Sequence, residues 1–187
     1  MGVDIGGNTI TQASSVLTIN TGVPMRLLST GGVVRPNQCQ FVALGSTATT
    51  WVNFTQAVWN VMQFPTTDVN ISSCFNTANG RFTAPVTGMY FFEVCCWILK
   101  DGASDGYYWH PCFAVNGALG GQAVNTAYPN YRIRGYGWPG ATYETTQITE
   151  VYSLAAGDYV EHQVYSTGSP TNRYHTPYQR FTGFLLG

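Results

Sequence analysis

Charged side chains are scarce in this sequence of 187 residues. Asp, Glu, Lys and Arg together make up 9% of the chain, whereas a typical soluble domain carries about 25%. The formal net charge is -1 and lysine occurs only at Lys100, which excludes a basic surface able to hold a nucleic-acid backbone. A monomer normally covers itself with more charge than this. We therefore expect much of the surface to be buried between subunits; the alternative is a neutral surface rich in Thr, Asn, Gln and Gly.

The sequence also lacks long apolar runs and export signals. No stretch approaches the ~18 consecutive apolar residues of a membrane-spanning helix, so we expect no membrane insertion. The opening residues carry no basic region followed by an apolar run. This argues against a secretory signal and for folding in a reducing cytoplasm.

Cysteine is present in an odd number and without the close pairs that metal and redox sites use. The five cysteines include no Cys-x-x-Cys pair, and an odd number cannot form a complete disulfide framework within one chain. Cys95 and Cys96 are neighbours on an expected strand and should point to opposite faces. We expect reduced thiols that contribute by packing alone, and hence a stability that is indifferent to reductant.

Aromatic residues are absent from the first 40 residues and dense from Trp51 onward. The opening segment alternates only weakly and is interrupted by glycine and proline, and strands this thin cannot bury a core alone. The change in composition predicts two parts. Residues 1–36 form a segment that pairs with copies of itself or with a host protein surface, and residues 37–187 form a head domain.

The head sequence consists of short apolar runs separated by turn residues such as Asn79-Gly80 and Asn116-Gly117. No window longer than about eight residues keeps a helical period. Several short strands at this spacing indicate an antiparallel sandwich or barrel. The expected strands are 40–44, 58–63, 90–99, 107–115, 128–135, 142–154, 158–166 and 181–186.

One expected strand, Tyr90–Leu99, is apolar on both faces except at Glu93. One of its faces can pack on the opposite sheet, and the other then needs another chain or a covering loop. We therefore assign its aromatic residues to the core or to a trimer interface: Tyr90, Phe91, Phe92 and Trp97.

The run from Phe75 to Phe92 carries a spaced pattern of glycine, proline and aromatic residues. The residues that form it are Asn79, Gly80, Phe82, Pro85, Gly88, Tyr90 and Phe92, and a second set follows at Leu154, Gly157, Asp158, Val160 and 181–186. Both sets resemble the globular head of the first complement component, a branch of the tumour-necrosis-factor-like superfamily; here the asparagine stands one residue closer to the first glycine. The resemblance covers residues 36–187. It implies an all-β, ten-stranded-type antiparallel jelly-roll sandwich that assembles into homotrimers.

The opening segment carries a second resemblance. Its runs 4–11, 17–19, 25–27 and 32–38 are similar to the lead-in of bacteriophage virion fibre proteins, which often carry a jelly-roll head at their tips. The collagen-like Gly-x-y stalk of the animal complement relatives is absent from the sequence. The resemblance implies a virion protein whose N-terminal segment contacts other virion proteins.

Two glycine-containing motifs are incomplete. The GxGxxG pattern at 135–140 contains Pro139 and is followed by strand-like residues, whereas a dinucleotide site needs a helix there. The run Asp101–Gly106 matches part of a calcium loop, but the twelfth place holds Cys112 where that loop has a bidentate glutamate. We interpret this run as a tight turn and leave a weak calcium site open.

The histidines show no pattern typical of a metal or catalytic site. His110, His162 and His175 lack metal-ligand spacing. The sequence also has no GxSxG nucleophile elbow. We therefore expect no catalytic residue, no cofactor and no metal site.

Aromatic residues and arginines alternate in the segment around Gly135. Flat rings beside guanidinium donors suit sugars, whose C–H faces stack while their hydroxyls form hydrogen bonds. The candidate receptor-binding residues are Tyr128, Tyr131, Arg132, Arg134, Tyr136 and Trp138. The alternative is that these rings pack against a neighbouring subunit.

The leading hypothesis is a non-enzymatic bacteriophage virion protein, made in the host cytoplasm: a trimeric short tail or baseplate fibre knob that adheres to host-surface glycan. The first alternative is a trimeric capsid decoration or cement protein. The second is a secreted ligand or lectin-like binding module. The expected partners are copies of itself, other virion proteins and host cell-surface glycan, but neither nucleic acid nor membrane.

Overall fold

The computed structural model describes residues 38–48, 51–99, 108–119, 135–136, 143–166 and 173–186. All of them belong to one compact unit, Pro36–Gly187. The segment expected at residues 1–36 lies outside the described residues. Within the described ranges the regular elements are strands, apart from the short 3-10 helix η1 (Thr176–Tyr178).

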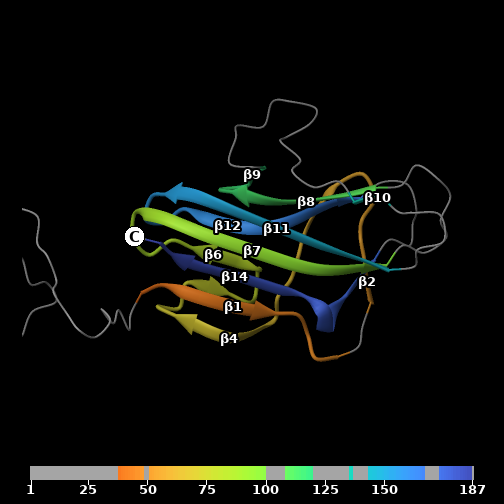
Figure 1. Ribbon diagram of the computed structural model, residues 1–187, viewed down its shortest axis with the longest axis horizontal. Helices are drawn as coiled ribbons and strands as arrows, with labels where there is room; N and C mark the ends of the chain where they lie inside the picture. Colours follow the sequence, from red (N-terminus) through yellow and green to blue (C-terminus); the bar gives the residue numbers. More distant parts are fainter. Residues whose placement is uncertain are drawn as a thin grey trace, which may run out of the picture. The chain divides into compact units, whose positions relative to one another are not determined.

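The first sheet is organised around β7 (Gly88–Leu99), and we call it the β7 sheet. β11 (Tyr143–Leu154) pairs with β7 over its full length, and β14 (Arg180–Leu185) and β13 (Arg173–His175) pair with the other edge. β1 (Gln40–Leu44) and β4 (Thr66–Ile71) follow beyond β14, and β2 (Trp51–Asn53) pairs with β13. All these pairs are antiparallel, and Figure 1 shows the strands side by side.

The second sheet is organised around β12 (Tyr159–Ser166), and we call it the β12 sheet. β8 (Tyr108–Val115) pairs with one edge of β12, whereas β3 (Trp59–Val61) and β6 (Arg81–Thr83) pair with the other. β5 (Phe75–Asn76) extends β6, and β9 (Ala118–Leu119) and β10 (Gly135–Tyr136) pair with β8. The two-sheet antiparallel architecture confirms the predicted all-β sandwich.

The core between the two sheets is aromatic. Side chains alternate along β7, so that one set is buried against the β12 sheet: Tyr90, Phe92, Val94, Cys96 and Ile98. The rings of Phe41 and Phe75 stack at 4.7 Å between centroids, and those of Phe82 and Phe92 meet edge to face at 5.0 Å. Because alternate strand residues point to opposite faces, Cys95 and Cys96 separate as predicted: Cys96 is buried and Cys95 is half-buried outside.

At two positions neighbouring atoms come so close to the backbone that only glycine fits. A Cβ at Gly183 would lie 2.5 Å from Cε1 of Phe41 and 2.7 Å from Cδ1 of Phe92, so the absence of a side chain lets these two rings pack over β14. Gly80 has a φ of +69°, and a Cβ there would lie 2.5 Å from the carbonyl oxygen of Met62. Only glycine adopts that backbone conformation without strain, which explains its place in the sequence pattern after Asn79.

Candidate functional site

The four residues assigned to the core or a trimer interface separate by their position along β7. Tyr90 and Phe92 are fully buried between the sheets. Phe91 and Trp97 lie on the opposite face of the strand, which is the outer face of the β7 sheet, and both are half-buried. The outer face of this sheet is therefore the candidate site for contact with another chain.

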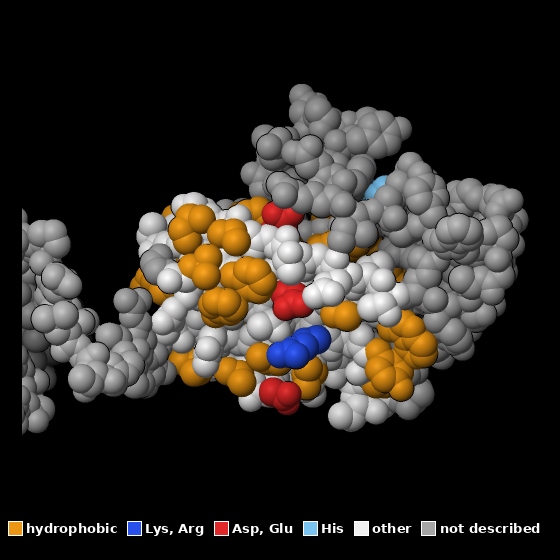
Figure 2. All heavy atoms as spheres, in the orientation of Figure 1, with side chains coloured by type: hydrophobic (Ala, Val, Ile, Leu, Met, Phe, Trp, Pro, Cys, Tyr) orange, Lys and Arg blue, Asp and Glu red, His pale blue; other side chains and the backbone are white. Residues whose placement is uncertain are grey.

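Five apolar side chains gather on this outer face, and we call them the apolar patch: Met89, Phe91, Val151, Phe184 and Leu186. The register aligns Val151 with Phe91 and Phe91 with Phe184, whose rings lie 5.1 Å apart. Met89, Val151 and Leu186 remain 42%, 45% and 50% exposed. In Figure 2 hydrophobic side chains gather toward both ends of this face, and a row of charged side chains runs between them.

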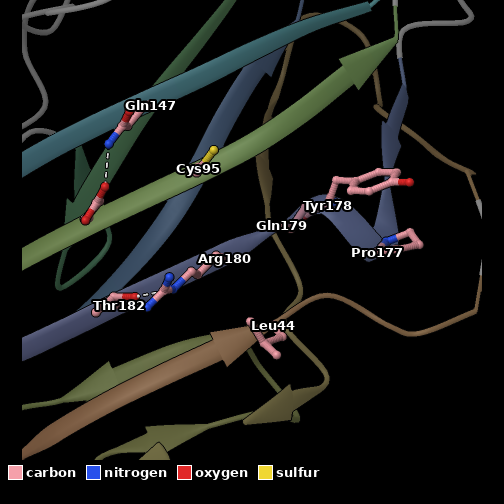
Figure 3. A pocket seen from close by; sticks show the side chains of 9 residues that line it. Leu44, Cys95, Gln147, Pro177, Tyr178, Gln179, Arg180 and Thr182 are labelled. Atoms are coloured by element: carbon pink, nitrogen blue, oxygen red, sulfur yellow. Dashed lines mark hydrogen bonds between the residues drawn. The ribbon is translucent and has the colours of Figure 1, made fainter. Parts of the chain in front are cut away.

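Polar side chains form the strip next to the apolar patch, and we call them the polar belt: Glu93, Gln147, Arg180 and Thr182. The side-chain amide of Gln147 donates a hydrogen bond to Glu93 across the β11–β7 pair. On β14, Nε of Arg180 donates to Oγ1 of Thr182 at 3.2 Å. Figure 3 shows both hydrogen bonds, together with Cys95 on the strand between Gln147 and Arg180. The belt thus carries one acid and one base beside the apolar patch.

A hollow of about 440 Å³ opens beside the polar belt. Its other walls come from Leu44, Cys95 and η1, where the 59% exposed Tyr178 packs edge-on against Trp97 at 4.7 Å. Burial raises the pKa of the Cys95 thiol, and the charge of Glu93 raises it further. A thiol with a raised pKa stays protonated at neutral pH, which is the opposite of an activated nucleophile.

The outer face of the β12 sheet has a different character. Glu161 is only 3% exposed, and Nε of Arg81 bonds to its Oε2 at 2.7 Å. The guanidinium of Arg81 also lies over the ring of Tyr159, 4.2 Å from its centroid, and the amide of Gln163 donates to Glu161. The hydrogen bond and charge of Glu161 raise the pKa of Arg81. These polar groups therefore find their partners within the chain.

The histidine that the structure places in the hydrophobic core is His162. His162 is completely buried between the rings of Phe64 and Phe113, with Nδ1 3.9 Å from Sγ of Cys96. Burial lowers the pKa of His162 to about 3. Nowhere in the described ranges do three or more His, Cys, Asp or Glu side chains form a group that could hold a metal ion. The calcium-like run Asp101–Gly106 lies outside these ranges.

The candidate receptor-binding residues are almost all beyond the described ranges. Tyr136 belongs to β10, where its backbone pairs with that of Tyr108. The other five lie outside the described residues: Tyr128, Tyr131, Arg132, Arg134 and Trp138. In the part of the chain that the structure describes, no helix has the length and apolar character needed to span a membrane.

Comparisons with known proteins agree with this geometry. The C1q domain family model matches residues 43–109, which include the glycine, proline and aromatic pattern. The globular domain of zebrafish complement 1qA protein superposes with a TM-score of 0.55 at 16% identity, covering 80% of this chain and 98% of that chain. The head has the C1q/TNF-like jelly-roll fold.

A second solved structure extends the likeness to the tumour-necrosis-factor branch. The TNF protein Eiger from S. frugiperda superposes on the C1q/TNF-like head with a TM-score of 0.52 at 12% identity, covering 81% of this chain and 94% of that chain. No curated protein matches the sequence significantly. Identities this low establish the fold alone.

Sequence reasoning named Phe91 and Trp97 but not the residues that lie beside them on the outer face of the β7 sheet. Met89, Val151, Phe184 and Arg180 come from three different strands, and Leu186 directly follows β14; they meet only through the β11–β7–β14 pairing. Alternation within each strand indicates which residues share a face. It does not indicate which strands are neighbours, so the patch and the belt could not be assembled from the sequence.

Proposed function

We propose that the C1q/TNF-like head is a homotrimeric binding module that associates through the apolar patch and the polar belt. The observation that carries this proposal is the patch itself, where Met89, Val151 and Leu186 are 42–50% exposed on one sheet face. Contiguous exposed apolar side chains typically mark an interaction surface. The low charge of the whole chain, 9%, supports the same conclusion.

Three copies are the expected assembly, because the sequence resemblance implies a compact trimer with apolar strand faces packed around its axis. Light scattering on the full chain tests this directly. The expected mass is three times the 20.4 kDa of one chain. A mass of 20.4 kDa at micromolar concentration contradicts the proposal, because the patch would then remain exposed in solution.

We further propose that the trimer is the knob of a short tail or baseplate fibre on a bacteriophage particle, and that it adheres to host-surface glycan. The aromatic-free residues 1–36, similar to the lead-ins of virion fibre proteins, support an attachment role. Immunogold electron microscopy of particles tests the location. Label on the tail or baseplate supports the fibre role. Label on the capsid lattice supports a decoration protein instead, and absence of label from particles supports a secreted ligand or lectin-like module.

The adhesion role has its own test at Tyr136 and Trp138, the proposed stacking platforms. Loss of one aromatic contact at a binding hot spot typically costs ~2 kcal/mol, or roughly thirtyfold in affinity. Tyr136→Ala and Trp138→Ala should each weaken attachment to host cells while the trimer and its melting temperature stay nearly unchanged. Loss of the trimer would assign the rings to the subunit interface, and unchanged attachment would exclude them from the receptor site.

A further inference from the structure

Cys39 and Cys74 come together where the head begins. Cys39 immediately precedes β1, and Cys74 lies between β4 and β5, close to the point where Gln40 pairs with Ile71. The carbonyl of Cys39 accepts the amide of Leu185 at 3.1 Å, which ties it to β14 in the β7 sheet. The carbonyl of Cys74 accepts the amide of Thr83 at 2.7 Å, which ties it to β6 in the β12 sheet. The two cysteines thus belong to opposite sheets.

The two thiols are in contact inside the core. Both residues belong to the single buried cluster, with exposed fractions of 2% and 4%. The thiol of Cys39 forms a hydrogen bond with the sulfur of Cys74, and the backbone N–H of Gln40 donates to that same sulfur. Contact between the sulfurs requires side chains that point toward each other, which is the arrangement that a disulfide needs.

We propose that Cys39 and Cys74 are a redox pair, which forms a disulfide joining the two sheets when the chain folds in the presence of a low-molecular-weight disulfide. In the first step the thiolate of one of the two cysteines attacks one sulfur of the oxidant RSSR, which forms a mixed disulfide and releases RSH. The other cysteine then loses its proton, attacks the sulfur of the first cysteine and releases the second RSH. The protein dithiol gives up two electrons and two protons, and RSSR is reduced to two RSH.

One hydrogen bond joins the two sulfurs, so a thiolate on either cysteine is stabilised by the thiol of the other. Burial raises the pKa of the remaining thiols, those of Cys95, Cys96 and Cys112.

This pair departs from what the odd cysteine count indicated. Three cysteines do remain without a mate, but the fold brings the other two together across 35 positions of sequence. A bond between them would close the loop that contains β1 to β4 and fix the beginning of the head. Because both sulfurs face the interior, the inference holds for the monomer and for the trimer alike and does not depend on the proposed function.

Refolding of the full chain in glutathione disulfide tests the proposal, because both sulfurs are then accessible. The five thiols of the reduced chain, titrated after denaturation, should decrease by two, and mass spectrometry of a digest should find the Cys39 and Cys74 peptides linked. The melting temperature should exceed that of the reduced chain by roughly 5–15 °C. Excess dithiol should reverse both changes.

Two variants make the test specific. Cys95→Ala removes a thiol outside the pair, so its linked peptide and its thermal shift should match those of the unchanged chain. Cys74→Ala should lose both. Five remaining thiols after refolding, or a linkage that involves other cysteines, would overturn the proposal. The peptide map of the unchanged chain decides the matter even where Cys74→Ala does not fold.

Discussion

The outer faces of the two sheets differ in their side chains: one carries a buried, paired charge and the other carries exposed apolar residues. On the β12 sheet Glu161 is buried at 3% exposure but bonded to Arg81 and Gln163, so a charge inside the fold has its partners inside the same chain. On the β7 sheet Met89 and Leu186 are 42% and 50% exposed, and no covering segment is seen over them among the described residues. The charge on the first face is paired within one chain, whereas the second face leaves apolar side chains exposed.

This difference separates two ways in which the chain places its few charges and its apolar side chains. Burying an ion pair costs desolvation free energy, which the attraction between the charges offsets only when their geometry is good. The 2.7 Å bond between Arg81 and Glu161 supplies that geometry. The exposed apolar area of the patch contributes no burial free energy within the monomer. It stabilises the protein only when it is removed from water, by about 25 cal/mol per Å². Changes on the two faces should therefore alter different properties: assembly for the β7 sheet, and stability for the β12 sheet.

The largest effect is expected at the centre of the apolar patch. Phe91→Asp should convert the trimer into monomers, because association would bury a carboxylate without a partner in each interface, at a cost of several kcal/mol per site. Circular dichroism should still show folded β-sheet, since Phe91 is outside the core. The measurement is the mass by light scattering, at concentrations where the unchanged chain is a trimer.

Val58 offers the matched control for this change. It is another exposed apolar residue, 44% exposed, but it precedes β3 of the β12 sheet. Val58→Asp should leave the trimer intact. If Val58→Asp dissociates the assembly and Phe91→Asp does not, the interface lies on the β12 sheet. The proposal that the β7 sheet forms the interface would then be wrong.

The next effect concerns the acid sensitivity that His162 gives to the β12 sheet. Its pKa is lowered by burial to about 3 from 6.5, so it is neutral in the fold and becomes protonated on unfolding in acid. Its contribution is complete above pH 6.5 and is lost as the pH falls from 6.5 toward 3. The free energy of unfolding should decrease by about 2 kcal/mol between pH 7 and pH 5, as measured by urea denaturation.

His162→Leu provides the reference for this pH dependence. The variant keeps an apolar side chain between the rings of Phe64 and Phe113 but has no group that titrates at this position. Its unfolding free energy should change less between pH 7 and pH 5 than that of the unchanged chain. Equal slopes for the two proteins would show that the acid sensitivity originates at another residue.

A smaller effect on stability is expected at the ion pair between Arg81 and the buried Glu161. Arg81→Met should leave Glu161 with the Gln163 amide but without its cation, and it also removes the contact with Tyr159. Because Arg81 is 39% exposed, water replaces part of the lost interaction, and we expect a destabilisation of about 1.5 kcal/mol. Urea denaturation measures it. The mass of the assembly should not change, and a monomeric variant would contradict the separation between the two faces.

How much of this could be predicted from sequence depends on strand length. The long alternating runs were found: β1 has the predicted bounds, and β7, β11 and β12 differ from the prediction by one or two residues at their first end. β4, with the polar sequence TTDVNI, gave no apolar signal because it pairs only with β1 at the edge of the sheet. β2, β5 and β13 are too short for any period to be recognised.

The candidate site shows a second limit. Phe91 and Trp97 could be recognised because both faces of one strand are apolar. The polar belt could not, because Glu93 and Arg180 are far apart in sequence and become neighbours only when β14 pairs with β7. The contact between Cys39 and Cys74 has the same origin, since it depends on which strands meet. Pairing between distant strands is the information that a single sequence does not provide.

The smallest effect is expected in the polar belt, and it tests which part of the β7 sheet holds the trimer together. Arg180→Gln should leave the trimer assembled and weaken it by about 0.5 kcal/mol at low salt, because exposed charges contribute little and are screened. The dissociation midpoint during dilution, read by fluorescence anisotropy of labelled chains, measures this, and the difference should disappear in 1 M salt, where the Debye length is about 3 Å. Glu93→Gln, which keeps a hydrogen-bond acceptor for Gln147, should behave alike. If Arg180→Gln instead dissociates the trimer as fully as Phe91→Asp, the belt rather than the apolar patch supplies the association energy.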